Sequence, residues 1–126
     1  MGNKNLVNKL TQLLRDFQVA TPGVLGSGII STDGFTIASD LPTTIEEHRV
    51  AAMAAAMLVL GEQTTQEFEQ GSLKRIFVEG ESGHVIVMNA GAESLLSAVV
   101  RKEVKLGFVF LQMQRAAHSI RSLMER

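Results

Sequence analysis

The chain has 126 residues, of which 45% are hydrophobic, so one domain over residues 1–126 can build its own core. Its 12 basic and 13 acidic residues leave a formal charge of −1, without the basic excess that nucleic-acid binding requires. It contains no cysteine, which excludes disulfides, thiolate metal ligands and a thiol nucleophile.

The first segment has the periodicity of an amphipathic helix. Its apolar residues recur at steps of four, three and four with charged residues between them: Leu6, Leu10, Leu13 and Phe17. Pro22-Gly23 ends this helix, and a strand is predicted over residues 24–31, with glycines that leave room for a closely packed neighbour. Thr32-Asp33-Gly34 predicts a hairpin turn before a returning strand over residues 35–39.

A long helix is predicted from about Ile45 to Gln70, after a loop that ends in the capping residues Thr43 and Thr44. Ala51 to Ala56 are strong helix formers, and Gly71 closes the helix. From Val50 to Leu60 the segment is apolar all round, so we expect both of its faces to be covered. Met53 and Met57 fit core packing and an adaptable interface equally well.

Three further strands and a helix complete the chain. The strands are predicted over residues 73–79, 84–89 and 94–100, with turns at residues 80–83 and 90–93. The last helix has apolar residues at steps of four, three, four, three and four: Leu106, Phe110, Met113, Ala117, Ile120 and Met124.

This order, α-β-β-α-β-β-β-α, predicts an α/β (α+β) fold with a five-stranded antiparallel sheet between helices. The two terminal helices have matching apolar stripes and can lie together on one face of the sheet, which leaves the long middle helix for the other face. The outer side of that helix then has nothing in the monomer to cover it. A self-complementary homodimer is the commonest way to bury such a surface.

No catalytic, cofactor-binding or metal-binding constellation is recognised. The glycines between Gly23 and Gly28 match neither the Walker pattern nor the dinucleotide fingerprint. His48, His84 and His118 lack the spacing of a zinc site and are interpreted as surface residues, and Ser82 as a turn residue. The longest apolar run is too short to span a membrane and no signal peptide is evident, so we expect a cytoplasmic protein without membrane insertion.

Several segments resemble the roadblock (dynein light-chain) domain family. Residues 23–39 resemble its first hairpin, the alanine-rich helix its long helix, residues 80–87 its next hairpin, and Leu106-Gly107 with Met113, Arg115 and Ala116-Ala117 its last helix. The resemblance covers roughly residues 4–125. It implies a roadblock/profilin-like fold, with one long helix on one face of the sheet and two terminal helices on the other.

The resemblance also implies how the chain pairs. Roadblock domains form homodimers or heterodimers by pairing the third strand and the long helix with their copies, which here are residues 73–79 and 45–70. The residues expected at this dimer interface are Ala52, Met53, Ala55, Ala56, Val59, Arg75 and Phe77. A charge at Ala55 or Ala56 is therefore expected to disrupt dimer or core packing.

In function, the family resembles a non-enzymatic platform for small Ras-like GTPases, and it is similar to bacterial and archaeal GTPase regulators. The expected GTPase-docking residues are Glu46, Arg49, Met53 and Met57. Activation of hydrolysis would proceed by positioning switch residues of the GTPase, because Arg49 and Arg75 are better interpreted as solvated surface residues than as arginine fingers. The alternative is a scaffold or motor-associated light chain that binds peptides or other roadblock proteins whatever the nucleotide.

Overall fold

The computed structural model describes residues 2–125, with side chains from Lys4 onward. Its elements follow the predicted order: α1 (Gly2–Ala20), β1 (Val24–Ser31), β2 (Thr36–Asp40), α2 (Glu47–Glu67), β3 (Arg75–Glu79), β4 (Gly83–Asn89), β5 (Ser94–Arg101) and α3 (Leu106–Met124). The predicted boundaries differ from the observed ones by a few residues at most.

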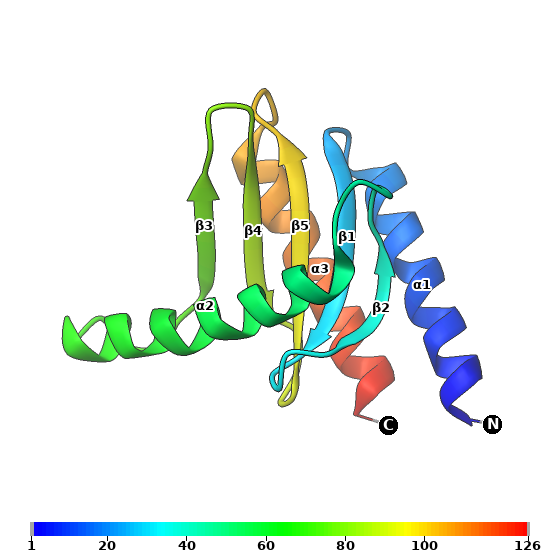
Figure 1. Ribbon diagram of the computed structural model, residues 1–126, viewed down its shortest axis with the longest axis horizontal. Helices are drawn as coiled ribbons and strands as arrows, with labels where there is room; N and C mark the ends of the chain where they lie inside the picture. The colour runs from blue at the N-terminus through cyan, green and yellow to red at the C-terminus, as the bar shows by residue number, and fades with distance from the viewer. Residues whose placement is uncertain (1, 126) are drawn as a thin grey trace.

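The five strands form one antiparallel sheet in the order β2-β1-β5-β4-β3. Figure 1 shows α1 and α3 behind this sheet and α2 in front of it, which confirms the predicted sandwich. In this view α2 crosses the lower ends of the strands and continues past β3, so its second half extends beyond the edge of the sheet. β2 and β3 are the two edge strands.

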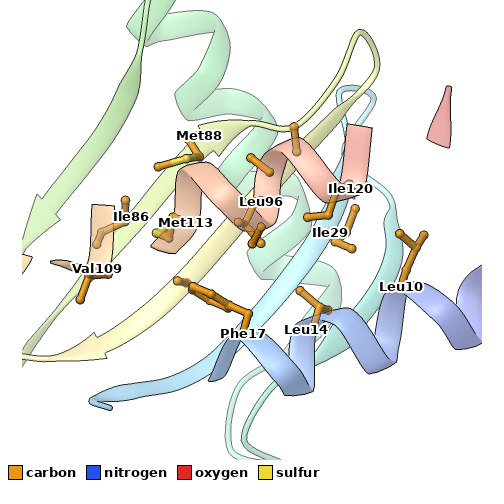
Figure 2. Packing of buried hydrophobic residues seen from close by; sticks show 14 of the residues in the cluster. Leu10, Leu14, Phe17, Ile29, Ile86, Met88, Leu96, Val109, Met113 and Ile120 are labelled. Atoms are coloured by element: carbon orange, nitrogen blue, oxygen red, sulfur yellow. The ribbon is translucent and has the colours of Figure 1, made fainter. Parts of the chain in front are cut away.

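The larger core lies between the sheet and the two terminal helices (Figure 2). α1 contributes Leu10, Leu14 and Phe17, all at most 6% exposed, and α3 packs its own apolar stripe beside them. Facing side chains come from alternate positions of the central strands: Ile29, Ile86, Met88, Leu96, Ala98 and Val100. The apolar periodicity of the terminal segments therefore marks the helix faces that the sheet covers.

A smaller core lies between the sheet and α2. Ala51 and Ala54 are each 1% exposed and pack with Ile30, Val87 and Leu95 on the opposite face of the strands. Alanine suits these positions because its short side chain lets the helix approach the sheet closely.

Both ends of α2 correct the sequence analysis. Thr43 and Thr44 do not cap the helix: Glu46 is the N-cap residue, and its side chain makes no capping hydrogen bond. The helix ends at Glu67 instead of Gln70, and the chain turns through Glu69, which has a left-handed φ of 56°, before Gly71 at 83°. Six polar residues in a row, from Glu62 to Glu67, are followed by an exposed Phe68 and give the sequence no clear stop signal here.

His84 was expected at the surface, and this expectation was wrong. The side chain is only 6% exposed, and its ring lies 5.0 Å from the ring of Phe77. His84 shares its strand face with Ile86 and Met88, which pack beneath α3. His48 and His118 are exposed, as predicted.

At Gly26, the backbone of β1 lies very close to the loop that follows β2. A Cβ atom at this position would lie 2.6 Å from Cδ of Pro42 and 3.2 Å from the carbonyl oxygen of Asp40. We expect Gly26→Ala to lower the free energy of unfolding by about 1–3 kcal/mol, because the loop must shift to admit the methyl group.

Urea unfolding followed by circular dichroism measures this change. Gly107→Ala is the matched control, because an added Cβ there has no heavy atom within 4 Å. Equal stability of the two variants would show that the loop accommodates a side chain at Gly26 without cost.

Candidate interaction surface

The outward side of α2 carries a continuous stripe of exposed apolar residues. Met53, Val59 and Leu60 are 56%, 53% and 65% exposed, and Ala52 and Ala56 are also exposed. These residues recur at helical spacing on the side opposite Ala51 and Ala54. The sequence analysis expected both faces of this segment to be covered, and among the side chains that the structure describes, from Lys4 to Glu125, only those of the sheet-facing side are.

The other predicted α2 residues divide between the surface and the smaller core. Glu46 and Arg49 are exposed near the beginning of the helix. Ala55 is half-buried, and a Cβ added to Gly34 in the β1–β2 turn would lie 3.6 Å from its methyl group. Met57 is half-buried and packs against the smaller core, so of the two methionines only Met53 is available to a partner.

The two residues of β3 that were predicted at the dimer interface, Arg75 and Phe77, lie on the opposite side of the sheet from α2. The guanidinium carbon of Arg75 lies 4.5 Å from the centre of the Phe110 ring, and the Phe77 ring meets that ring edge-on at 6.2 Å. Arg75 is half-buried and its Nε is buried without a hydrogen-bond partner, whereas Phe77 remains 38% exposed. Arg75 is therefore a stacked side chain of the sheet edge, not the solvated surface residue that was expected.

A row of three valines crosses the part of the sheet that α2 leaves open. Val78 pairs with Val85 across β3 and β4, and Val85 pairs with Val99 across β4 and β5. Val78 is 45% exposed, and the other two are half-buried. These residues share the α2 side of the strands, at the ends farther from α2 in Figure 1.

Leu60, Phe68 and Val78 belong to this exposed apolar surface and were missed by the sequence analysis. Leu60 could have been found, because it lies seven residues after Met53 and thus on the same helix face. Phe68 follows the last helical turn and is 71% exposed, and Val78 belongs to an edge strand with a neighbour on one side only. No periodic signal in the sequence distinguishes these two from core residues.

Titratable groups are scattered over the described part of the chain. Within residues 2–125, no three or more His, Cys, Asp or Glu side chains gather as metal ligands. No helix in that range is both long and apolar enough to cross a membrane. What the described surface offers is an apolar stripe on α2 and an open strand edge at β3.

The Roadblock/LC7 domain family model matches residues 10–101. The chain belongs to the Roadblock/LC7 domain family. Two similar relatives are the uncharacterised proteins MJ1340 and MJ0310 of Methanocaldococcus jannaschii, each 36% identical over 103 residues, which cover 82% of this chain and 90% of the relative.

Solved structures agree with the roadblock fold. A Roadblock/LC7 domain from Streptomyces avermitilis superposes with a TM-score of 0.86 at 20% identity, covering 92% of this chain and 98% of that one. The gliding protein MglB from Thermus thermophilus gives 0.83 at 18% identity, covering 95% and 91%. Profilin II of Acanthamoeba castellanii gives 0.65 at 15% identity, covering 88% and 95%, which confirms the predicted roadblock/profilin-like architecture.

Proposed function

We propose that this roadblock protein is a non-enzymatic homodimeric regulator that binds a Ras-like small GTPase and stimulates its GTP hydrolysis. The exposed apolar stripe of α2 is the observation that carries the proposal. Met53, Val59 and Leu60 face solvent in the monomer. Binding a second surface over them would remove their apolar area from water, which stabilises the complex. MglB, a protein of the same fold, is described as a gliding protein and has a structure in a tetrameric arrangement, which supports an assembling role.

The proposed dimer pairs β3 with its copy. β3 is an edge strand, and an edge strand presents unpaired backbone N–H and C=O groups that a second strand can satisfy. Antiparallel pairing of two identical strands places a two-fold axis perpendicular to the sheet, and this axis exchanges the two ends of the strands. The partner's α2 would then cross the ends that this chain's α2 leaves open.

In this symmetric arrangement the partner subunit would cover the valine row. The second half of α2 extends past β3, so in the dimer it reaches over the partner's sheet at the level of Val78 and Val85. The sheet-facing side of the partner's α2 would therefore cover the valine row of each chain, once on each side of the axis. Leu60 lies on the same half of the helix but on its outward side, and remains part of the apolar stripe.

Matching of charges and of apolar residues favours one register for the strand pair. Residues opposite each other across the axis must lie on the same face of the joined sheet, which allows only registers centred on a residue. A register centred on Phe77 places Arg75 opposite Glu79 of the partner subunit and Ile76 opposite the partner subunit's Val78. Moving the centre to Val78 would instead place the apolar Phe77 opposite a carboxylate. The register centred on Phe77 matches opposite charges with each other and apolar residues with each other.

The GTPase is proposed to dock on the paired α2 helices. Arg49 and Glu46 flank the apolar stripe near the beginning of each helix, and Met53 supplies an adaptable apolar contact beside them. Because Arg75 is stacked on Phe110 on the other side of the sheet, it is not placed to act as an arginine finger from this surface. Stimulation of hydrolysis would come from ordering the switch residues of the GTPase itself.

Nucleotide-dependent binding tests this function and separates it from the scaffold alternative. The tagged protein is incubated with native lysate containing a GTP analogue or GDP, and captured proteins are identified by mass spectrometry. A Ras-like GTPase retained only with the analogue, and hydrolysing GTP faster with the purified protein, is the expected result. The same non-GTPase partner in both samples would instead support the scaffold.

Arg49→Glu is expected to weaken GTPase binding by about tenfold or more, because it reverses a charge at the rim of the proposed docking surface. The matched control is Arg115→Glu, which makes the same charge change at an exposed position of α3 behind the sheet. Isothermal titration calorimetry with the identified GTPase measures both affinities. Equal affinity of the two variants would place docking elsewhere.

A further inference from the structure

A second feature lies away from the apolar stripe, at the corner of the sheet where β3 begins. Arg75, the first residue of β3, pairs with Met88, so Asn89 at the end of β4 has no strand neighbour on that side. Residues 68–74 lead from the end of α2, which lies beyond the edge of the sheet, back to the beginning of β3 (Figure 1). The result is a cleft of about 1010 Å³ that is open between the second half of α2 and the second half of α3.

One wall of this cleft is cationic. Its charges come from Lys74 and Arg75 at the beginning of β3 and from Arg121 of α3, and His118 also lines this wall. Arg75 is held in place by its stacking on Phe110, and Nη2 of Arg121 donates a hydrogen bond of 3.2 Å to Oδ1 of Asn89. Both arginines of this wall are therefore already positioned, which lowers the entropic cost of binding an anion beside them.

The facing wall has a different chemistry. Glu62, Thr65 and Gln66 line it from α2, and Glu69 lines it from the turn that follows. Carboxylates, hydroxyls and amides in this arrangement suit a ligand with several hydroxyl or amino groups. Leu58, Leu73 and Met88 add an apolar part to the lining. A site with an anion-binding wall, a polar wall and a small apolar surface resembles small-molecule pockets more closely than protein interfaces.

We propose that this cleft binds a small phosphorylated metabolite of the sugar-phosphate or nucleoside-phosphate class. The phosphate lies against Lys74 and Arg121, because clustered Lys and Arg donors match its charge and its several acceptor oxygens. The sugar hydroxyls face Glu62 and Gln66 across the cleft. Nothing in this proposal depends on dimerisation or on a GTPase.

The test follows backbone amide resonances of the full-length ¹⁵N-labelled protein during titration with ribose 5-phosphate, with AMP, and with ribose as the phosphate-free probe, all at constant ionic strength. Saturable shifts with either phosphate compound, concentrated in residues 71–75 and 114–121, and none with ribose, are the expected result. Shifts that are absent, equally large with ribose, or spread over all surface lysines would overturn the proposal.

Arg121→Gln and Lys74→Gln are the test variants, each expected to weaken binding by about tenfold or more through loss of a charge-assisted hydrogen bond. Arg115→Gln, outside the cleft lining, is the matched control and is expected to bind as the unmodified chain does. Unchanged affinity in both test variants would overturn the proposal. Sedimentation velocity on the same samples reports the oligomeric state, so failure of ligand binding in an intact dimer is distinguishable from failure of the proposed dimer.

Discussion

Ala54→Asp is expected to unfold the chain in dilute buffer, whereas Ala56→Asp is expected to leave a folded monomer that no longer dimerises. Ala54 is 1% exposed and packs with Val87 and Leu95, where a carboxylate has no partner. An uncompensated buried charge costs about 3–5 kcal/mol, which is a large part of the stability of a typical small domain. Ala56, two residues later, is exposed on the apolar stripe.

The charge at position 56 therefore remains in water as long as the chain is a monomer. In the monomer, Ala56→Asp lowers the free energy of unfolding only through the lower helix propensity of Asp, by at most about 0.7 kcal/mol. In the proposed dimer the same carboxylate would be trapped between two apolar helices without a partner, and that cost would fall on association.

Circular dichroism during urea unfolding measures the fold of both variants, and sedimentation velocity at several protein concentrations measures their association. Because dimerisation itself stabilises the folded chain, stability is compared at concentrations where each variant is monomeric. Unfolding of Ala56→Asp to the same extent as Ala54→Asp would contradict the assignment of helix faces. A folded, unchanged dimer of Ala56→Asp would contradict the proposed interface.

Arg75→Glu is expected to weaken the dimer, and the double variant Arg75→Glu with Glu79→Arg is expected to restore it. In the register centred on Phe77 the single change places two carboxylates opposite each other at two symmetry-related positions. Loss of two attractive pairs and gain of two repulsive ones amounts to about 1–3 kcal/mol per dimer. The double change exchanges the charges and recreates both attractive pairs.

The double variant is also a control for a local effect. Arg75→Glu removes the stacking of the guanidinium on Phe110, which weakens the monomer independently of any partner. That loss is present in both variants, so the difference in their dimer dissociation constants, measured by sedimentation equilibrium, isolates the cross-strand pairs. A double variant that dissociates as readily as the single one would contradict the proposed register.

Local patterns in the sequence determined the elements of this protein and their order. The apolar steps of residues 6–17 and 106–124 predict helices because one side of each helix must be apolar to face the sheet, and the buried positions of α1 and α3 agree. Asp33-Gly34 predicts the first hairpin because few residues adopt a positive φ, and Gly34 has a φ of 91°. The uncovered side of α2 also followed from the sequence, since a helix on one face of a sheet cannot bury its whole circumference.

Only the tertiary structure decided which side chains of those elements are available to a partner. Met53 and Met57 are equivalent in sequence, and the crossing position of α2 over the strands makes the first exposed and the second half-buried. His84 is buried because Phe77 and the side of the sheet beneath α3 surround it, and α3 is distant from it in sequence. Lys74 and Arg121 are far apart in sequence and line the same cleft, at the corner where β3 begins one position short of the end of β4. Such contacts depend on how separate elements pack, and local periodicity carries no information about them.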